Sequence, residues 1–132
     1  MVTRATFLKQ LWVSLPALLA LSFEEVALLL WRGALPGPAE AVGFTAPDLG
    51  VAVPRLRALL PADATPLLVL PLFVAALALQ DPSRHGAVGD AEQQRARALV
   101  RRLAAVLALP ARPGRVAAAL AAPSVAAAVL GA

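Results

Sequence analysis

Long apolar runs without charge limit what this chain can fold into. Residues 64–80 and 116–132 contain no charged side chain, and between residues 10 and 31 the only charges are Glu24 and Glu25. The chain of 132 residues is 60% hydrophobic, against roughly 45–50% in ordinary soluble domains. A single water-soluble domain of this size would expose much of that surface. The pattern therefore favours a chain whose apolar surface is covered by a bilayer or by a partner.

Helix-stop residues divide the apolar runs into helix-sized segments. We predict an all-α fold: a small helical membrane protein with about two to three apolar helices and one basic amphipathic helix, forming a single helical unit over residues 1–132. The alternative is a soluble helical bundle that hides its apolar faces internally.

Part of the hydrophobicity can also come from the base composition of the gene. The chain has no Ile, Asn, Tyr or Cys, and Lys9 is its single lysine. This is typical of a GC-rich gene, because the codons for Ile, Asn, Tyr and Lys are rich in A and T. Such a gene inflates Ala and Leu. The lack of cysteine also excludes disulfides and thiolate metal sites.

The N-terminal segment is compatible with four interpretations. A helix from Trp12 to Trp31 would be about 30 Å long, enough to cross a bilayer with a tryptophan at each end. Two short helices are the second interpretation, because Ser22 and Glu25 form a capping-box pattern. The third is a signal peptide over residues 1–22. The fourth is a mitochondrial presequence, since the first turns are basic and free of acids.

Glu24 and Glu25 are the ionisable residues inside this segment. In a membrane-spanning helix they would be candidates for proton or ion handling. In two shorter helices they are the first-turn acids of a helix that follows Ser22 and stops at Gly33, where the helix dipole favours them. The capping pattern favours the second interpretation, because it gives both carboxylates a local role.

A connector rich in proline and glycine is predicted for residues 33–61, with room for one short helix over residues 55–60. The next apolar block, Ala64 to Gln80, is marginally long enough to span a bilayer and contains Pro66 and Pro71. Proline is better tolerated in a membrane helix than in an exposed one, because neighbouring helices satisfy the freed carbonyl. We predict this block as an apolar helix.

Residues 90–109 give the clearest amphipathic pattern, with Asp90 as predicted N-cap and Gln93 in the box position. At 100° per residue, the basic side of this helix carries Arg95, Arg97, Arg101 and Arg102. The apolar side carries Leu99, Val100, Leu103, Val106 and Leu107. We predict that the four arginines, together with Trp12 and Trp31, contact lipid head groups or a partner. The alternative is a core-facing bundle helix with a solvated basic face.

The C-terminal segment from Val116 to Ala132 is mostly alanine and is interrupted by Pro123. Alanine contributes little to membrane insertion, so this segment is a weak candidate for a span. Its small side chains suit close packing between helices.

The sequence contains no recognisable catalytic motif. The single histidine, His85, lies between Arg84 and Gly86 in a predicted loop, which is typical of an exposed surface residue. We find no His or Cys cluster, no phosphate-binding glycine loop and no local Ser-His-Asp motif. We expect no enzymatic activity, no catalytic residue, no cofactor and no metal site.

The net charge of +4 is supplied almost entirely by arginine, which favours phosphate or carboxylate partners. Nucleic acid is not expected among them, because no surface aromatics are interleaved with the basic residues and no nucleic-acid-binding motif is found. Lipid head groups offer the same phosphate chemistry.

These features predict a non-catalytic, membrane-embedded accessory or assembly subunit of a larger membrane complex. Its partners would be membrane lipids and other membrane-protein subunits, in a bacterial inner membrane or an organellar membrane. One alternative is a small transporter or ion-conducting component that uses Glu24 or Glu25. Another is a soluble or secreted helical bundle that binds a hydrophobic partner.

Overall fold

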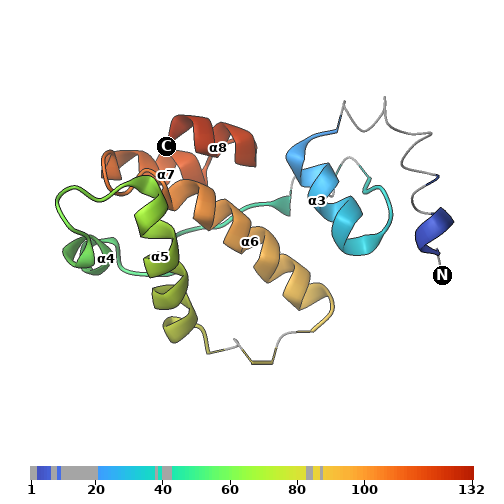
Figure 1. The fold of residues 1–132 in the computed structure, drawn as a ribbon, viewed down its shortest axis with the longest axis horizontal. Helices are drawn as coiled ribbons and strands as arrows, with labels where there is room; N and C mark the ends of the chain where they lie inside the picture. The colour runs from blue at the N-terminus through green and yellow to red at the C-terminus, as the bar shows by residue number, and fades with distance from the viewer. Residues whose placement is uncertain are drawn as a thin grey trace. The chain divides into compact units, whose positions relative to one another are not determined.

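The computed structural model describes residues 3–6, 9, 21–37, 39, 43–82, 85–86 and 88–132. All regular secondary structure in these ranges is helical, which confirms the all-α prediction (Figure 1). The contacts divide the chain into two compact units, residues 1–43 and residues 44–132. Each unit is described by itself.

Helix α3, Phe23–Arg32, is the main described element of the first unit. It begins at a complete capping box: the Ser22 hydroxyl accepts a hydrogen bond from the Glu25 N–H at 3.2 Å, and the Glu25 carboxylate accepts one from the Ser22 N–H at 2.7 Å. It ends at Gly33, whose φ of 73° is left-handed and whose N–H donates to the Leu29 carbonyl at 2.8 Å. The predicted start and stop of this helix are confirmed.

The capping box contradicts the interpretation of one helix from Trp12 to Trp31. Ser22 has an extended backbone, with φ −69° and ψ 163°. A helix cannot continue through such a residue. Trp12 and most of the predicted cleavable segment, residues 1–22, lie outside the described residues.

The second unit contains six helical elements in its described residues. They are α4 (Val53–Leu59), α5 (Pro66–Gln80), α6 (Asp90–Val106), the 3₁₀ turn η2 (Pro113–Arg115), α7 (Val116–Leu120) and α8 (Val125–Gly131). Helix α6 contacts α5, α7 and α8, and α5 also contacts α4. Figure 1 shows α6 between α5 on one side and α7 with α8 on the other. Helix α4 lies inside the predicted connector, residues 33–61.

Helix α5 forms where the sequence predicted an apolar helix. Pro66 is its first residue, a position where proline has the helical φ and needs no N–H partner. Pro71 lies inside the helix and has no N–H, so the Leu67 carbonyl lacks its usual helical donor. Val69 and Phe73 are completely buried against the rest of the unit. The 15 residues of α5 extend about 22 Å.

Helix α6 matches the predicted amphipathic helix, residues 90–109, except at its ends. Its cap is Gly89 rather than Asp90, and the Gly89 carbonyl accepts a hydrogen bond from the Gln93 N–H at 3.1 Å. The predicted cap is therefore wrong by one residue. Asp90 instead lies in the first turn, where the helix dipole still favours a negative charge.

The predicted C-terminal apolar segment breaks into α7 and α8. Ser124 begins α8, and its hydroxyl accepts a hydrogen bond from the Ala127 N–H at 3.1 Å. Pro123 precedes it in the turn between the two helices. No helix in the described ranges has both the length and the apolar character that crossing a bilayer requires.

The core of the second unit is built from a few large side chains and many alanines. The small alanines of α6, α7 and α8 let these helices approach closely, and Phe73 of α5 is completely buried. The largest fully buried side chains of this unit are Phe44, Phe73, Leu109, Val69 and Val106.

Removal of the α3 cap should destabilise that helix. We expect Ser22→Ala to cost about 1 kcal/mol of local stability, because the Glu25 N–H loses its acceptor. Hydrogen exchange of the first amides of α3 should accelerate accordingly. Ser22→Thr keeps a capping hydroxyl and should exchange like the wild type. Equal protection in both variants would contradict the role of the cap.

Phe73 should contribute most of the packing free energy between α5 and the core. We expect Phe73→Ala to reduce the free energy of unfolding by about 3–5 kcal/mol, because it leaves a cavity around a fully buried ring. The neighbouring Val74 is 44% exposed, so Val74→Ala should change the free energy of unfolding by about 0.5 kcal/mol or less. Urea denaturation of the three proteins measures the difference, and similar midpoints would contradict this packing.

Candidate interaction surface

Arg101 of α6 is almost completely buried, with 2% of its surface exposed. Its Nε donates a hydrogen bond to the Phe44 carbonyl at 2.8 Å. One terminal nitrogen donates to the Ser124 carbonyl at 2.8 Å and to the Ala119 carbonyl at 3.4 Å. The guanidinium thereby joins the first residue of the second unit, the end of α7 and the cap of α8 to the central helix.

This burial removes Arg101 from the predicted set of surface arginines. The 100° spacing of the sequence analysis placed four arginines on one exposed side, but other elements contact α6 on two sides. Arg97 lies on the same side as Arg101: its guanidinium carbon is 5.9 Å from the centre of the Phe44 ring, a cation–π distance. The Arg97 Nε is buried and has no hydrogen-bond partner among the described residues.

Arg102 is turned the other way, toward the loop that precedes α4. Its Nε donates to the Asp48 carbonyl at 2.9 Å, and a terminal nitrogen lies 3.4 Å from the Asp48 carboxylate. That carboxylate also accepts the Gly50 N–H at 2.8 Å. Gly50 has a φ of +73°, and a Cβ there would lie 2.8 Å from a methyl carbon of Leu77. The left-handed φ strains any other residue here, and a Cβ would also require the Leu77 methyl to move, so this position favours glycine.

Arg95 forms an ion pair with Asp81, the residue that follows α5. The two side chains are 38% and 26% exposed, so water screens the pair and its net contribution is modest. Arg95 and Arg102 were predicted to contact lipid or a partner. In the structure, both bind carboxylates of the same chain.

An open groove of about 940 Å³ lies between α5 and α6. Arg95, Leu99 and Arg102 line it from one face of α6, and Leu77 lines it from α5. The walls are mostly apolar, and both arginines are bound to carboxylates. The groove is large enough for a small ligand.

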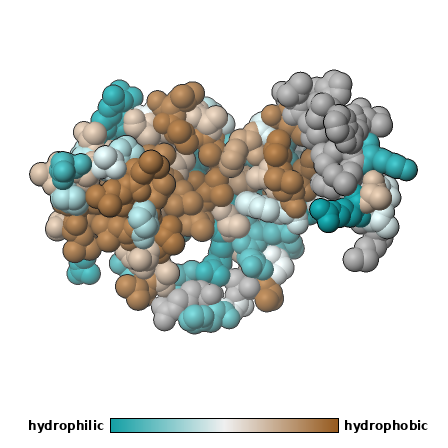
Figure 2. Space-filling view, in the orientation of Figure 1, coloured by the Kyte–Doolittle hydropathy of each residue, from teal (hydrophilic) through white to brown (hydrophobic). Residues whose placement is uncertain are grey.

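Among the described helices of the second unit, α5 exposes the most large apolar side chains. Apart from Pro66 and Gln80 at its two ends, its exposed residues share one side of the helix, which we call the α5 apolar face. Its four large aliphatic residues are Leu67, Leu68, Val74 and Leu79, with 76%, 47%, 44% and 78% of their surface exposed. Pro71, Ala75 and Ala78 complete the face. Figure 2 shows hydrophobic side chains gathered over α5.

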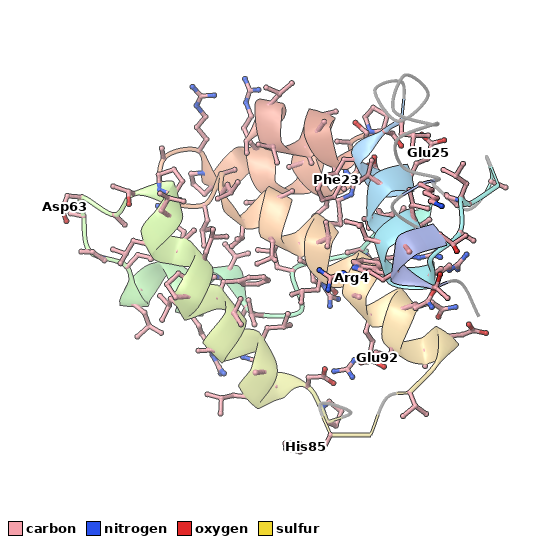
Figure 3. All side chains as sticks on the ribbon, turned by 45° about the vertical axis from the view of Figure 1, so that its right-hand side comes forward. Arg4, Phe23, Glu25, Asp63, His85 and Glu92 are labelled. Carbon is pink, nitrogen blue, oxygen red and sulfur yellow. The ribbon has the colours of Figure 1, made fainter. Side chains whose placement is uncertain are left out.

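Helix α5 has no charged residue, and the charged residues near it belong to neighbouring segments. Arg55 and Arg57 are exposed on α4, on either side of the buried Leu56. Asp63 projects from the turn between α4 and α5, and His85 lies in the loop that follows α5 (Figure 3). Among the described residues, no group of three or more His, Cys, Asp or Glu side chains could hold a metal ion.

In the first unit, the two predicted intramembrane carboxylates both lie in the first turn of α3. Glu25 belongs to the capping box, and Glu24 is 5% exposed. Trp31, at the other end of this helix, is 42% exposed. The positions of Glu24 and Glu25 agree with the local role favoured by the capping pattern.

Sequence reasoning identified α5 as apolar but missed its exposed side as a site. The helix has apolar residues all round, so periodicity does not distinguish its buried side from its exposed side. A usable signal was the complete absence of charge between Ala64 and Gln80. A helix buried on one side only needs polar residues on the other side, and α5 has none there.

Loss of the Arg101 guanidinium should destabilise the second unit more than loss of Arg102. We expect Arg101→Met to lower the free energy of unfolding by about 3 kcal/mol or more, because buried carbonyls lose their donor. Arg102→Met removes a contact to the largely exposed Asp48 and should cost about 1 kcal/mol or less. Chemical denaturation compares the two variants. Equal losses would contradict the special position of Arg101.

Comparison with known proteins gives no family for this chain. No family model matches it, and neither the curated proteins nor the solved structures contain a match. Functional inference therefore starts from the surfaces described above. Of these, the α5 apolar face departs most from the surface of an ordinary globular domain.

Proposed function

We propose that this chain is a non-catalytic accessory subunit of a larger membrane complex, and that the α5 apolar face is its attachment surface. The observation that supports the proposal is the exposure of Leu67, Leu68, Val74 and Leu79 on a helix without any charged residue. A contiguous apolar surface of this kind is costly in water and marks an interaction site.

The packing of α5 explains why its own unit does not cover this surface. Val69 and Phe73 are buried on one side of α5, and no other described helix of the second unit packs over the opposite side. Coverage by other molecules would remove four large aliphatic side chains from water. At about 25 cal/mol per Å² of apolar surface, such burial is a substantial driving force for association.

The two other functions considered from the sequence have less support. Transport through Glu24 or Glu25 would need a carboxylate available to a substrate, whereas Glu25 is hydrogen-bonded to the Ser22 N–H in the capping box. Binding of a hydrophobic partner by a free-standing helical bundle would use the same face of α5. The two functions differ in the partner: a free-standing bundle would bind a hydrophobic molecule, whereas the proposed subunit binds a membrane complex.

A charge placed on the α5 apolar face should detach the chain from its complex. We expect Val74→Glu to fold, because Val74 is 44% exposed, but to lose association because a buried, unpaired carboxylate is costly. Tagged chains are expressed in the native cells, crosslinked in isolated membranes, extracted with detergent and sized. The wild type should migrate in a particle much larger than 13.6 kDa, and Val74→Glu should not.

Val88→Glu is the matched control, because Val88 is 79% exposed in the loop before α6 and lies off the α5 apolar face. This variant should remain in the large particle. The proposed function is contradicted if the wild type is not found in a larger particle, or if Val74→Glu remains there like the control.

A further inference from the structure

Charged residues lie on the segments next to the α5 apolar face. Directly after α5, Asp81 is paired with Arg95. Helix α4, which contacts α5, carries the exposed Arg55 and Arg57. The described part of the chain holds neither of these two guanidinium groups in an ion pair or hydrogen bond.

Another arginine, Arg112, lies near the N-terminal end of α5. Arg112 lines a small hollow together with Pro66, the first residue of α5, and with Val129 of α8. Asp63, in the turn before α5, is the acidic residue of this region. Arg112 donates a hydrogen bond to the Ala132 carbonyl at 3.4 Å, so Arg55 and Arg57 are the basic groups near the α5 apolar face that form no ion pair or hydrogen bond in the described part of the chain.

The residue types on the α5 apolar face favour lipid over a protein surface. The centres of protein interfaces are enriched in aromatic residues, Met and Arg, which provide most of the binding energy. This face has only Leu, Val, Pro and Ala, and none of these side chains can form the hydrogen bonds that select one protein partner. A hydrocarbon layer requires no such groups.

The geometry also suits a helix that lies in the membrane interface. An interfacial helix buries its apolar side about 5–10 Å deep, while arginines keep their charge among the phosphates and their methylene groups on apolar surface. The α5 apolar face is about 22 Å long, and the adjoining helix α4 carries two exposed arginines, so both parts are present.

We propose that the α5 apolar face inserts into the surface of an anionic bilayer, with Arg55 and Arg57 contacting lipid phosphates. This inference rests on the proposed function, in which the same face is the attachment surface. It adds the identity of the occupant: anionic lipid itself, rather than an apolar protein surface.

The test is binding of the purified full chain to vesicles. One set contains equal parts phosphatidylglycerol and phosphatidylcholine, and the other contains phosphatidylcholine alone. We expect strong, salt-sensitive binding to the anionic set only. Arg55→Gln combined with Arg57→Gln should weaken this binding about 30-fold, since each basic residue near an anionic surface contributes about five- to sixfold. Val74→Glu should weaken it at least about tenfold.

The charge-matched control combines Arg4→Gln with Lys9→Gln, which removes the same two charges from the first unit. It should bind anionic vesicles like the wild type. The inference is overturned if this control loses binding as strongly as the α4 variant, if both vesicle sets bind equally, or if neither binds. Failure with vesicles, combined with release of Val74→Glu from the native particle, would leave the proposed function standing and point to a protein occupant.

Discussion

The packing of the second unit depends on the hydrogen bonds that the buried guanidinium of Arg101 donates. Burying a positive charge costs several kcal/mol unless its donors are satisfied, and here the carbonyls of Phe44, Ala119 and Ser124 accept them. Two of these carbonyls lie in the α7–α8 region, where the helices are short and mostly alanine. Such helices have little packing surface of their own. The buried charge therefore fixes them to α6 more specifically than alanine contacts could.

The sequence was sufficient to predict a helix boundary where the residue that caps the helix lies within a few positions of that boundary. Ser22, Glu25 and Gly33 determine the start and stop of α3 through hydrogen bonds no more than four residues apart. Proline and serine likewise mark the beginnings of α5 and α8. These elements follow from the backbone preferences of single residues, which sequence reasoning captures well.

The role of the α6 arginines could not be read in the same way. Arg101 binds a carbonyl 57 residues earlier in the chain, and Arg102 binds one 54 residues earlier. Spacing along α6 shows which residues share a side, but it does not show that other segments cover that side. The same limitation applies to α5: its uniform apolar composition predicts a helix and leaves its exposed side undetermined, because burial depends on packing with α4 and α6.

Pro71 has a consequence for how deep α5 can lie. The Leu67 carbonyl, deprived of its helical donor, is next to Pro71 on the exposed side of the helix. In hydrocarbon an unsatisfied carbonyl costs several kcal/mol, so this oxygen is stable only where water or another donor reaches it. In the proposed membrane-bound state, Pro71 would therefore limit the depth of α5: the aliphatic side chains would enter the apolar layer, and the backbone would stay at the hydrated boundary of that layer.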